Sequence, residues 1–181
     1  MRILKIIVFV TLGLSILVLL IFFGGYLYYS NKYPIDEDTY PAYVGHINQE
    51  TSSLNDVYKL CDGESIYHVH HGASEKGYAG NKKQFRDAIL ASYKNKNYSD
   101  SGYLNFRFLV TCEGNPGWFE TIQVDTDYNN TQFSKGLVSQ LQALTAKPEH
   151  WNVISFDDKP VDYYMYVSYK LLNGEIIEIL P

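Results

Sequence analysis

An unbroken apolar run from Ile6 to Phe23 dominates the start of the chain, whereas the later apolar residues recur at short, regular intervals. The run holds no charged side chain, and continued to Tyr26 it reaches the roughly 20 residues that a helix needs to cross a membrane. The pattern therefore predicts a transmembrane anchor over residues 1–29, which contacts lipid through residues 6–26.

Two later stretches alternate apolar and polar residues, which is the period of a strand with one buried face. In Gly102–Val124 the alternation is interrupted by the turn-forming residues Glu113–Gly117, which predicts an antiparallel hairpin. Val161–Leu172 alternates again and ends at Asn173-Gly174, the dipeptide preferred in a two-residue hairpin turn. Glu175–Leu180 is the expected return strand.

Two segments have the period of an amphipathic helix, Asn81–Lys94 and the stretch between Ser134 and Pro148. Ile66–His71 resembles a short strand. Together these patterns predict an α+β fold, a small antiparallel sheet with two helices packed on one face, preceded by one transmembrane helix.

Residues 30–60 are polar and aperiodic, so we expect a tether there and a folded domain over residues 61–181. Arg2 and Lys5 precede the apolar run and acidic residues follow it, which by the positive-inside rule places the N-terminus in the cytoplasm. We expect a single pass through the inner (cytoplasmic) membrane and a periplasmic domain. A cleaved signal peptide, the alternative, would have a shorter apolar region and a small-residue cleavage site before the tyrosines.

Composition narrows the function. The chain has 17 Tyr and 9 Phe, an aromatic content that suits half-buried strands. Its formal net charge is -5, so we expect no nucleic-acid partner. The sequence contains no Gly-x-Ser-x-Gly, no Walker loop and no cysteine and histidine setting suited to catalysis, so we expect neither enzymatic activity nor a cofactor.

The two cysteines, Cys61 and Cys112, both follow the apolar run and so lie on the side where disulfides form and persist. A disulfide between them is one reading, and two buried free thiols are the other.

Three histidines, His68, His70 and His71, form the candidate metal site. On a strand, His68 and His70 project to the same side about 6.6 Å apart along the chain, which suits zinc or copper if His46 or Glu64 supplies a third ligand. No recognised zinc spacing is present. Histidines that serve only as surface or hydrogen-bonded side chains are therefore the competing interpretation.

Several motifs of the second half of the chain resemble the C-terminal domain of TonB-type proteins, in the form found in Bacteroidetes. The resemblance covers about residues 78–181 and rests on Tyr78-Ala79-Gly80, the alternating Gly102–Val110, Glu113-Gly114, Trp151 and Asp158–Val161. It implies a small antiparallel sheet with two helices on one face, and a periplasmic, non-enzymatic module. It also implies partner binding, which in TonB itself pairs a strand with a segment of an outer-membrane receptor.

The chain departs from TonB in its anchor. TonB couples to a proton-driven motor through a membrane helix that carries a histidine, whereas here the span from Ile6 to Tyr29 holds no acidic, basic or histidine residue. We therefore expect a divergent relative that is not itself an energy transducer.

The resulting hypothesis is a membrane-anchored protein-interaction module that binds another envelope protein by strand addition. The candidate partner-binding residues are tyrosines and isoleucines of the last hairpin: Tyr163, Tyr164, Tyr166, Tyr169, Ile176, Ile177 and Ile179. The competing interpretation is that about half of these side chains belong to the core. The alternative is a ligand- or metal-sensing ectodomain that uses the block from His68 to His71.

Overall fold

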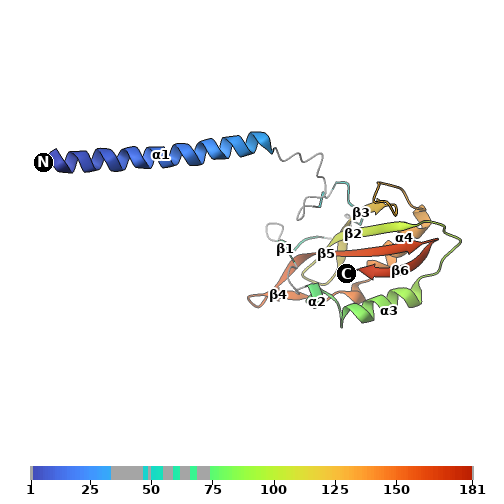
Figure 1. The fold of residues 1–181 in the computed structure, drawn as a ribbon. Helices are drawn as coiled ribbons and strands as arrows, with labels where there is room; N and C mark the ends of the chain where they lie inside the picture. Colours follow the sequence, from blue (N-terminus) through green and yellow to red (C-terminus); the bar gives the residue numbers. More distant parts are fainter. Residues whose placement is uncertain are drawn as a thin grey trace. The chain divides into compact units, whose positions relative to one another are not determined.

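The chain forms two compact units, Met1–Val44 and Gly45–Pro181. The structure is a computed structural model, and the residues it describes are 2–33, 47–48, 50–54, 59–61, 66–68 and 74–180. Figure 1 shows the elements of both units in order along the chain.

The first unit contains the single helix α1, Arg2–Lys32, which is long and apolar enough to cross a membrane. Its most apolar 18-residue window has a mean hydropathy of 3.1, and none of that window is buried against protein. The hydroxyls of Thr11 and Ser15 donate hydrogen bonds back to helix carbonyls, at 3.0 and 2.9 Å, so these polar groups are satisfied without water. The helix agrees with the anchor expected from the apolar run.

The second unit is an α+β domain whose described strands form one mixed, six-stranded sheet. The strands are β1 (Ile66–His68), β2 (Gly102–Val110), β3 (Pro116–Val124), β4 (Ile154–Phe156), β5 (Lys159–Leu172) and β6 (Glu175–Leu180). The helices are α2 (Ser74–Gly77), α3 (Lys82–Ser92) and α4 (Lys135–Thr145), with a 3-10 turn at Pro148–His150.

β5 is the longest strand, and most of the sheet is arranged around it. One edge pairs with β2, which in turn pairs with β3, all antiparallel. β1 and β6 also pair with β5, opposite Asp162–Tyr164 and Ser168–Leu172 respectively. The first residues of β5 form a tight hairpin with β4.

The expectation of a purely antiparallel sheet is corrected by β1, which runs parallel to β5. The direction of so short a strand is set by where its ends are attached, and the period of its side chains does not encode this. The domain also has the one-turn helix α2 in addition to the two helices expected.

Helices α3 and α4 pack on the same face of the sheet. Phe85 and Ile89 of α3, and Leu137 and Leu141 of α4, join the core, which confirms the predicted apolar faces. The strand residues of this core alternate along β2 and β5: Leu104, Phe106, Phe108, Tyr163, Met165, Val167, Tyr169 and Leu171. Burial of this aromatic-rich layer is the main stabilising contribution to the domain.

Both predicted hairpins form. β2 and β3 pair around the Glu113-Gly114 turn, in which Gly114 has a positive φ of 83°. Asn173 and Gly174, between β5 and β6, have φ angles of 50° and 75°, as a type I′ turn requires. Asn81, which precedes α3, caps this helix by accepting a hydrogen bond from the Gln84 N–H at 2.9 Å.

Part of the segment assigned from the sequence to a tether belongs to the folded unit. Ile47 is only 4 % exposed. Ser53 exchanges two backbone hydrogen bonds with Phe119 of β3, at 2.9 and 2.8 Å, and therefore covers part of that outer strand. A single bridging residue has no period, which is why the alternation of apolar residues did not reveal it.

The buried tyrosines predict how stability depends on pH. Burial raises the pKa of Tyr163 and Tyr169 above the ordinary value of 10.0. In the unfolded chain both phenols ionise near their ordinary pKa, whereas in the folded domain they stay protonated to higher pH. The free energy of unfolding is therefore at its full value below about pH 10 and falls as the pH rises further. Urea unfolding should therefore show a lower midpoint at about pH 11 than at about pH 8.

Tyr169→Phe provides the control. It removes one of these phenols and its hydrogen bond with Thr145, at 2.7 Å, so it should lower stability by about 1 kcal/mol at neutral pH and weaken the alkaline dependence. Equal midpoints at the two pH values would contradict this account.

Candidate functional site

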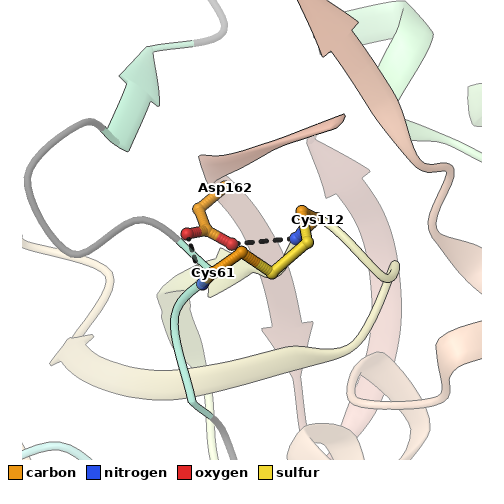
Figure 2. A group of neighbouring side chains, drawn as sticks. All are labelled: Cys61, Cys112 and Asp162. Atoms are coloured by element: carbon orange, nitrogen blue, oxygen red, sulfur yellow. Dashed lines mark hydrogen bonds between the residues drawn. A yellow bond between two sulfur atoms is a disulfide. The ribbon is translucent and has the colours of Figure 1, made fainter. Parts of the chain in front are cut away.

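A buried carboxylate lies beside a disulfide between the N-terminal part of the domain and the sheet. Cys61 and Cys112 form the disulfide, with their Cα atoms 6.1 Å apart. This agrees with the first of the two interpretations of the cysteines that the sequence left open. Asp162 of β5 is 1 % exposed and accepts hydrogen bonds from both cysteines. Its Oδ2 accepts from the Cys61 N–H at 2.9 Å and its Oδ1 from the Cys112 N–H at 2.8 Å (Figure 2).

This cluster is a structural clamp. Within the part of the chain that the structure describes, it is the one group of three cysteine, histidine or acidic residues with ligand atoms within 4.8 Å of one another. Both sulfurs are used by the disulfide, and the carboxylate oxygens are used by backbone N–H groups. The arrangement therefore fastens the segment at Cys61 to the end of β2 and to β5.

Asp162 was missed from the sequence, although a signal was present. It lies between Val161 and Tyr163 at the start of an apolar, aromatic strand. An acidic residue in such a place is buried only when hydrogen bonds compensate for its lost hydration, so it marks a specific internal partner.

The histidine hypothesis falls largely on residues that the structure does not describe. His68 is the last residue of β1, and its backbone pairs with Tyr164. His70, His71, His46 and Glu64 lie outside the described residues. The metal site stays a prediction.

The structure separates the candidate partner-binding residues into two groups. Tyr163 and Tyr169 are 0 % exposed and Ile179 is 7 % exposed, so these three belong to the core and are not presented to a partner. Their side chains point to the helix-covered face, since they alternate with the exposed residues of the same strands. Tyr164 and Ile176 are half-buried, whereas Tyr166 and Ile177 are 51 % and 55 % exposed.

β6 is an edge of the sheet. Its single partner strand in the described part of the chain is β5. The backbone N–H and C=O groups on its outer side can thus accept another strand. Ile177 and Leu180 expose apolar side chains along it, at 55 % and 40 %.

The segment after α3 fastens this helix to the start of β6. The Tyr93 hydroxyl donates to the carbonyl of Gly174, and the Asn95 Nδ2 donates to Glu175 Oε1 at 3.0 Å. Burial raises the pKa of Tyr93 to about 12, so its hydroxyl keeps its proton at neutral pH. These bonds hold the hairpin turn against the C-terminal end of α3.

The N-terminal half of α3 lies beside the end of β6. A pocket partly open to solvent is lined there by Ile179 of β6 and by Lys82, Lys83, Phe85 and Arg86 of α3. With its C-terminal end near Gly174 and its first turns near Ile179, α3 runs along β6. We refer to this pocket as the groove: its floor, Phe85 and Ile179, is apolar and its rim is basic.

The sheet face away from the helices is more polar. Arg107 and Glu120 form a cross-strand ion pair at 2.8 Å. Tyr103 stacks on Tyr128 with ring centroids 5.3 Å apart, and Lys170 lies 5.9 Å from the Tyr103 ring. The charged and aromatic side chains on this face therefore interact with one another.

No family model, no curated protein and no solved structure matches the chain. The fold and the surface therefore define the protein only as a domain of mixed α+β architecture, with an apolar N-terminal helix and an open sheet edge.

The disulfide should contribute strongly to stability. It closes a loop with a sequence separation of 51, for which the chain-entropy model gives about 4 kcal/mol. Cys61→Ala together with Cys112→Ala should lower the free energy of unfolding by up to that amount. Mass spectrometry with and without reductant checks the bond itself, and the absence of a two-dalton difference, expected for two added hydrogens, would disprove it.

Asp162→Asn tests the clamp without changing the size of the side chain. The amide keeps one oxygen acceptor but turns an NH2 group toward the other cysteine N–H, so we expect a loss of about 2 kcal/mol. Asp157→Asn, at an exposed turn with φ 48°, is the matched control and should leave stability nearly unchanged. Equal urea midpoints for the two variants would show that Asp162 does not act as a clamp.

Proposed function

We propose that this protein is a membrane-anchored, extracytoplasmic interaction module that binds another envelope protein by adding a strand to the outer edge of β6. The observation that carries the proposal is this edge, which has no partner strand in the described part of the chain and bears the exposed side chains of Ile177 and Leu180. Strand addition draws affinity from backbone hydrogen bonds and specificity from alternate side chains.

The proposal assigns binding, and not catalysis, to the domain. Its cluster of potentially reactive groups, Cys61, Cys112 and Asp162, is bonded internally. The resemblance of residues 78–181 to the TonB C-terminal domain supports the same role, because TonB itself pairs a strand with a segment of an outer-membrane receptor.

The sequence of the N-terminal helix supports a location at the inner membrane and argues against a role in energy transduction. Arg2 and Lys5 precede the apolar part of α1, which favours a cytoplasmic N-terminus and a periplasmic domain at the inner membrane. The apolar part has no acidic, basic or histidine side chain through which a proton gradient could act. The protein therefore does not act as an energy transducer.

Photo-crosslinking in cells tests the edge directly. A photoreactive residue replacing Ile177 should capture a second envelope protein, whereas the same residue replacing Val153 should not. Val153 is the matched control because it is 52 % exposed, against 55 % for Ile177, and lies just before β4, away from the edge.

The captured complex then allows a test of strand addition. Amide hydrogen exchange in β6 should slow when the partner is bound, since the outer N–H groups become hydrogen-bonded. No capture at Ile177, or the same captured proteins from both positions, would refute the proposal.

A further inference from the structure

The groove beside β6 combines an apolar floor with a concentration of positive charge. We propose that it accepts an extended protein segment rich in carboxylate side chains, which pairs with β6 and places acidic groups against Lys82, Lys83 and Arg86. The inference rests on the proposed function and adds to it the chemical class of the partner segment.

The charge is concentrated in one segment of an acidic chain. Six of the 15 Lys and Arg residues lie between Lys76 and Lys96, where Asp87 is the single acidic residue, although the whole chain has a formal net charge of -5. Three of the six, Lys82, Lys83 and Arg86, line the pocket beside Ile179. Three positively charged side chains therefore lie beside the open edge strand β6, next to Ile179.

The position of these cations on α3 is unfavourable for the helix itself. Lys82 and Lys83 occupy its first turn, which contains no acidic residue. The backbone dipoles give that end of a helix a partial positive charge, so cations there raise the energy of the isolated helix. A bound carboxylate would remove this repulsion, and it would interact with the helix end as well as with the side chains.

The neighbouring acidic groups do not neutralise the pocket. Asp87 bonds Lys83 at 2.6 Å and approaches Arg86 at 3.4 Å, which balances one charge of the three. Glu175 accepts from Asn95 at the other end of β6. Glu178 is paired in register with Lys170 and alternates with Ile179, which directs it to the opposite face of the sheet.

The geometry also specifies how the segment lies. α3 runs along β6, so side chains of an added strand that face the helix side follow the line of Ile179, Phe85 and the basic residues. Because side chains alternate along a strand, every second residue of the segment can reach the groove. An alternating pattern of acidic and β-branched residues fits this surface.

Peptide binding to the full chain in nanodiscs tests the inference by fluorescence anisotropy. The probe is a short labelled peptide in which glutamate alternates with threonine and isoleucine, and the comparison peptide has glutamine at every glutamate position. We expect the glutamate peptide to bind at least about tenfold more tightly, with an affinity that falls as salt is added.

Two charge-matched variants locate the effect. The triple variant Lys82→Gln, Lys83→Gln, Arg86→Gln should reduce binding of the glutamate peptide about tenfold, to the level of the glutamine peptide. The control triple, Lys76→Gln, Lys94→Gln, Lys96→Gln, removes the same charge from exposed positions of the same segment and should bind as the unchanged protein does. Unfolding curves of both variants check that folding is intact.

The possible failures are distinguishable. No binding of the glutamate peptide, equal binding of both peptides, or equal weakening by both triple variants overturns the acidic specificity, while capture at Ile177 would leave the proposed function standing.

A glutamate peptide methylated at alternate backbone nitrogens should bind far more weakly. If it binds equally well, strand addition fails. A dimer paired through β6 that the peptide does not dissociate would assign the groove to a second copy and overturn the inference.

Discussion

Backbone pairing along β5 is the interaction on which the domain depends. Among the described strands, β1, β2, β4 and β6 all bond to β5, and β3 is joined through β2. The strand can accept so many partners because β2 pairs with one of its edges, over Tyr163–Leu171, and the other partners take separate stretches of its 14 residues. β4 takes the first residues, and β1 and β6 take separate stretches further along. Side chains of β5 also form the centre of the core beneath α3 and α4.

This division decides which edges remain open. The bond between Cys61 and Cys112, with the Asp162 carboxylate, secures the chain just before β1. β1 is then paired with β5. On the other side of the sheet, Ser53 covers part of β3 through its two bonds with Phe119. The N-terminal part of the domain thus covers part of β5 and part of β3, while β6 keeps an outer side that pairs with no described strand.

The local structure could be predicted from the sequence to a large extent, because it is encoded in short-range patterns. The alternation in β2 and β5, the Asn173-Gly174 turn and the apolar stripe of α3 each reflect the geometry of a few neighbouring residues. The parallel pairing of β1 and the bridge at Ser53 depend on attachments between distant segments, which no local period encodes. The burial of Tyr163, Tyr169 and Ile179 followed from the same alternation that marked the strands, once the helix-covered face was known.

The candidate groove could not be predicted because its components come from separate elements. Lys82, Lys83 and Arg86 were recognisable only as the polar side of an amphipathic helix, and such a side usually faces water. Their proximity to Ile179 depends on the bonds from Tyr93 and Asn95 that align α3 with β6. Two cations in the first turn nevertheless contradict the local preference of a helix. Because natural sequences tend to satisfy such preferences except where function opposes them, this conflict supports a role for the basic rim in binding that folding alone would not require.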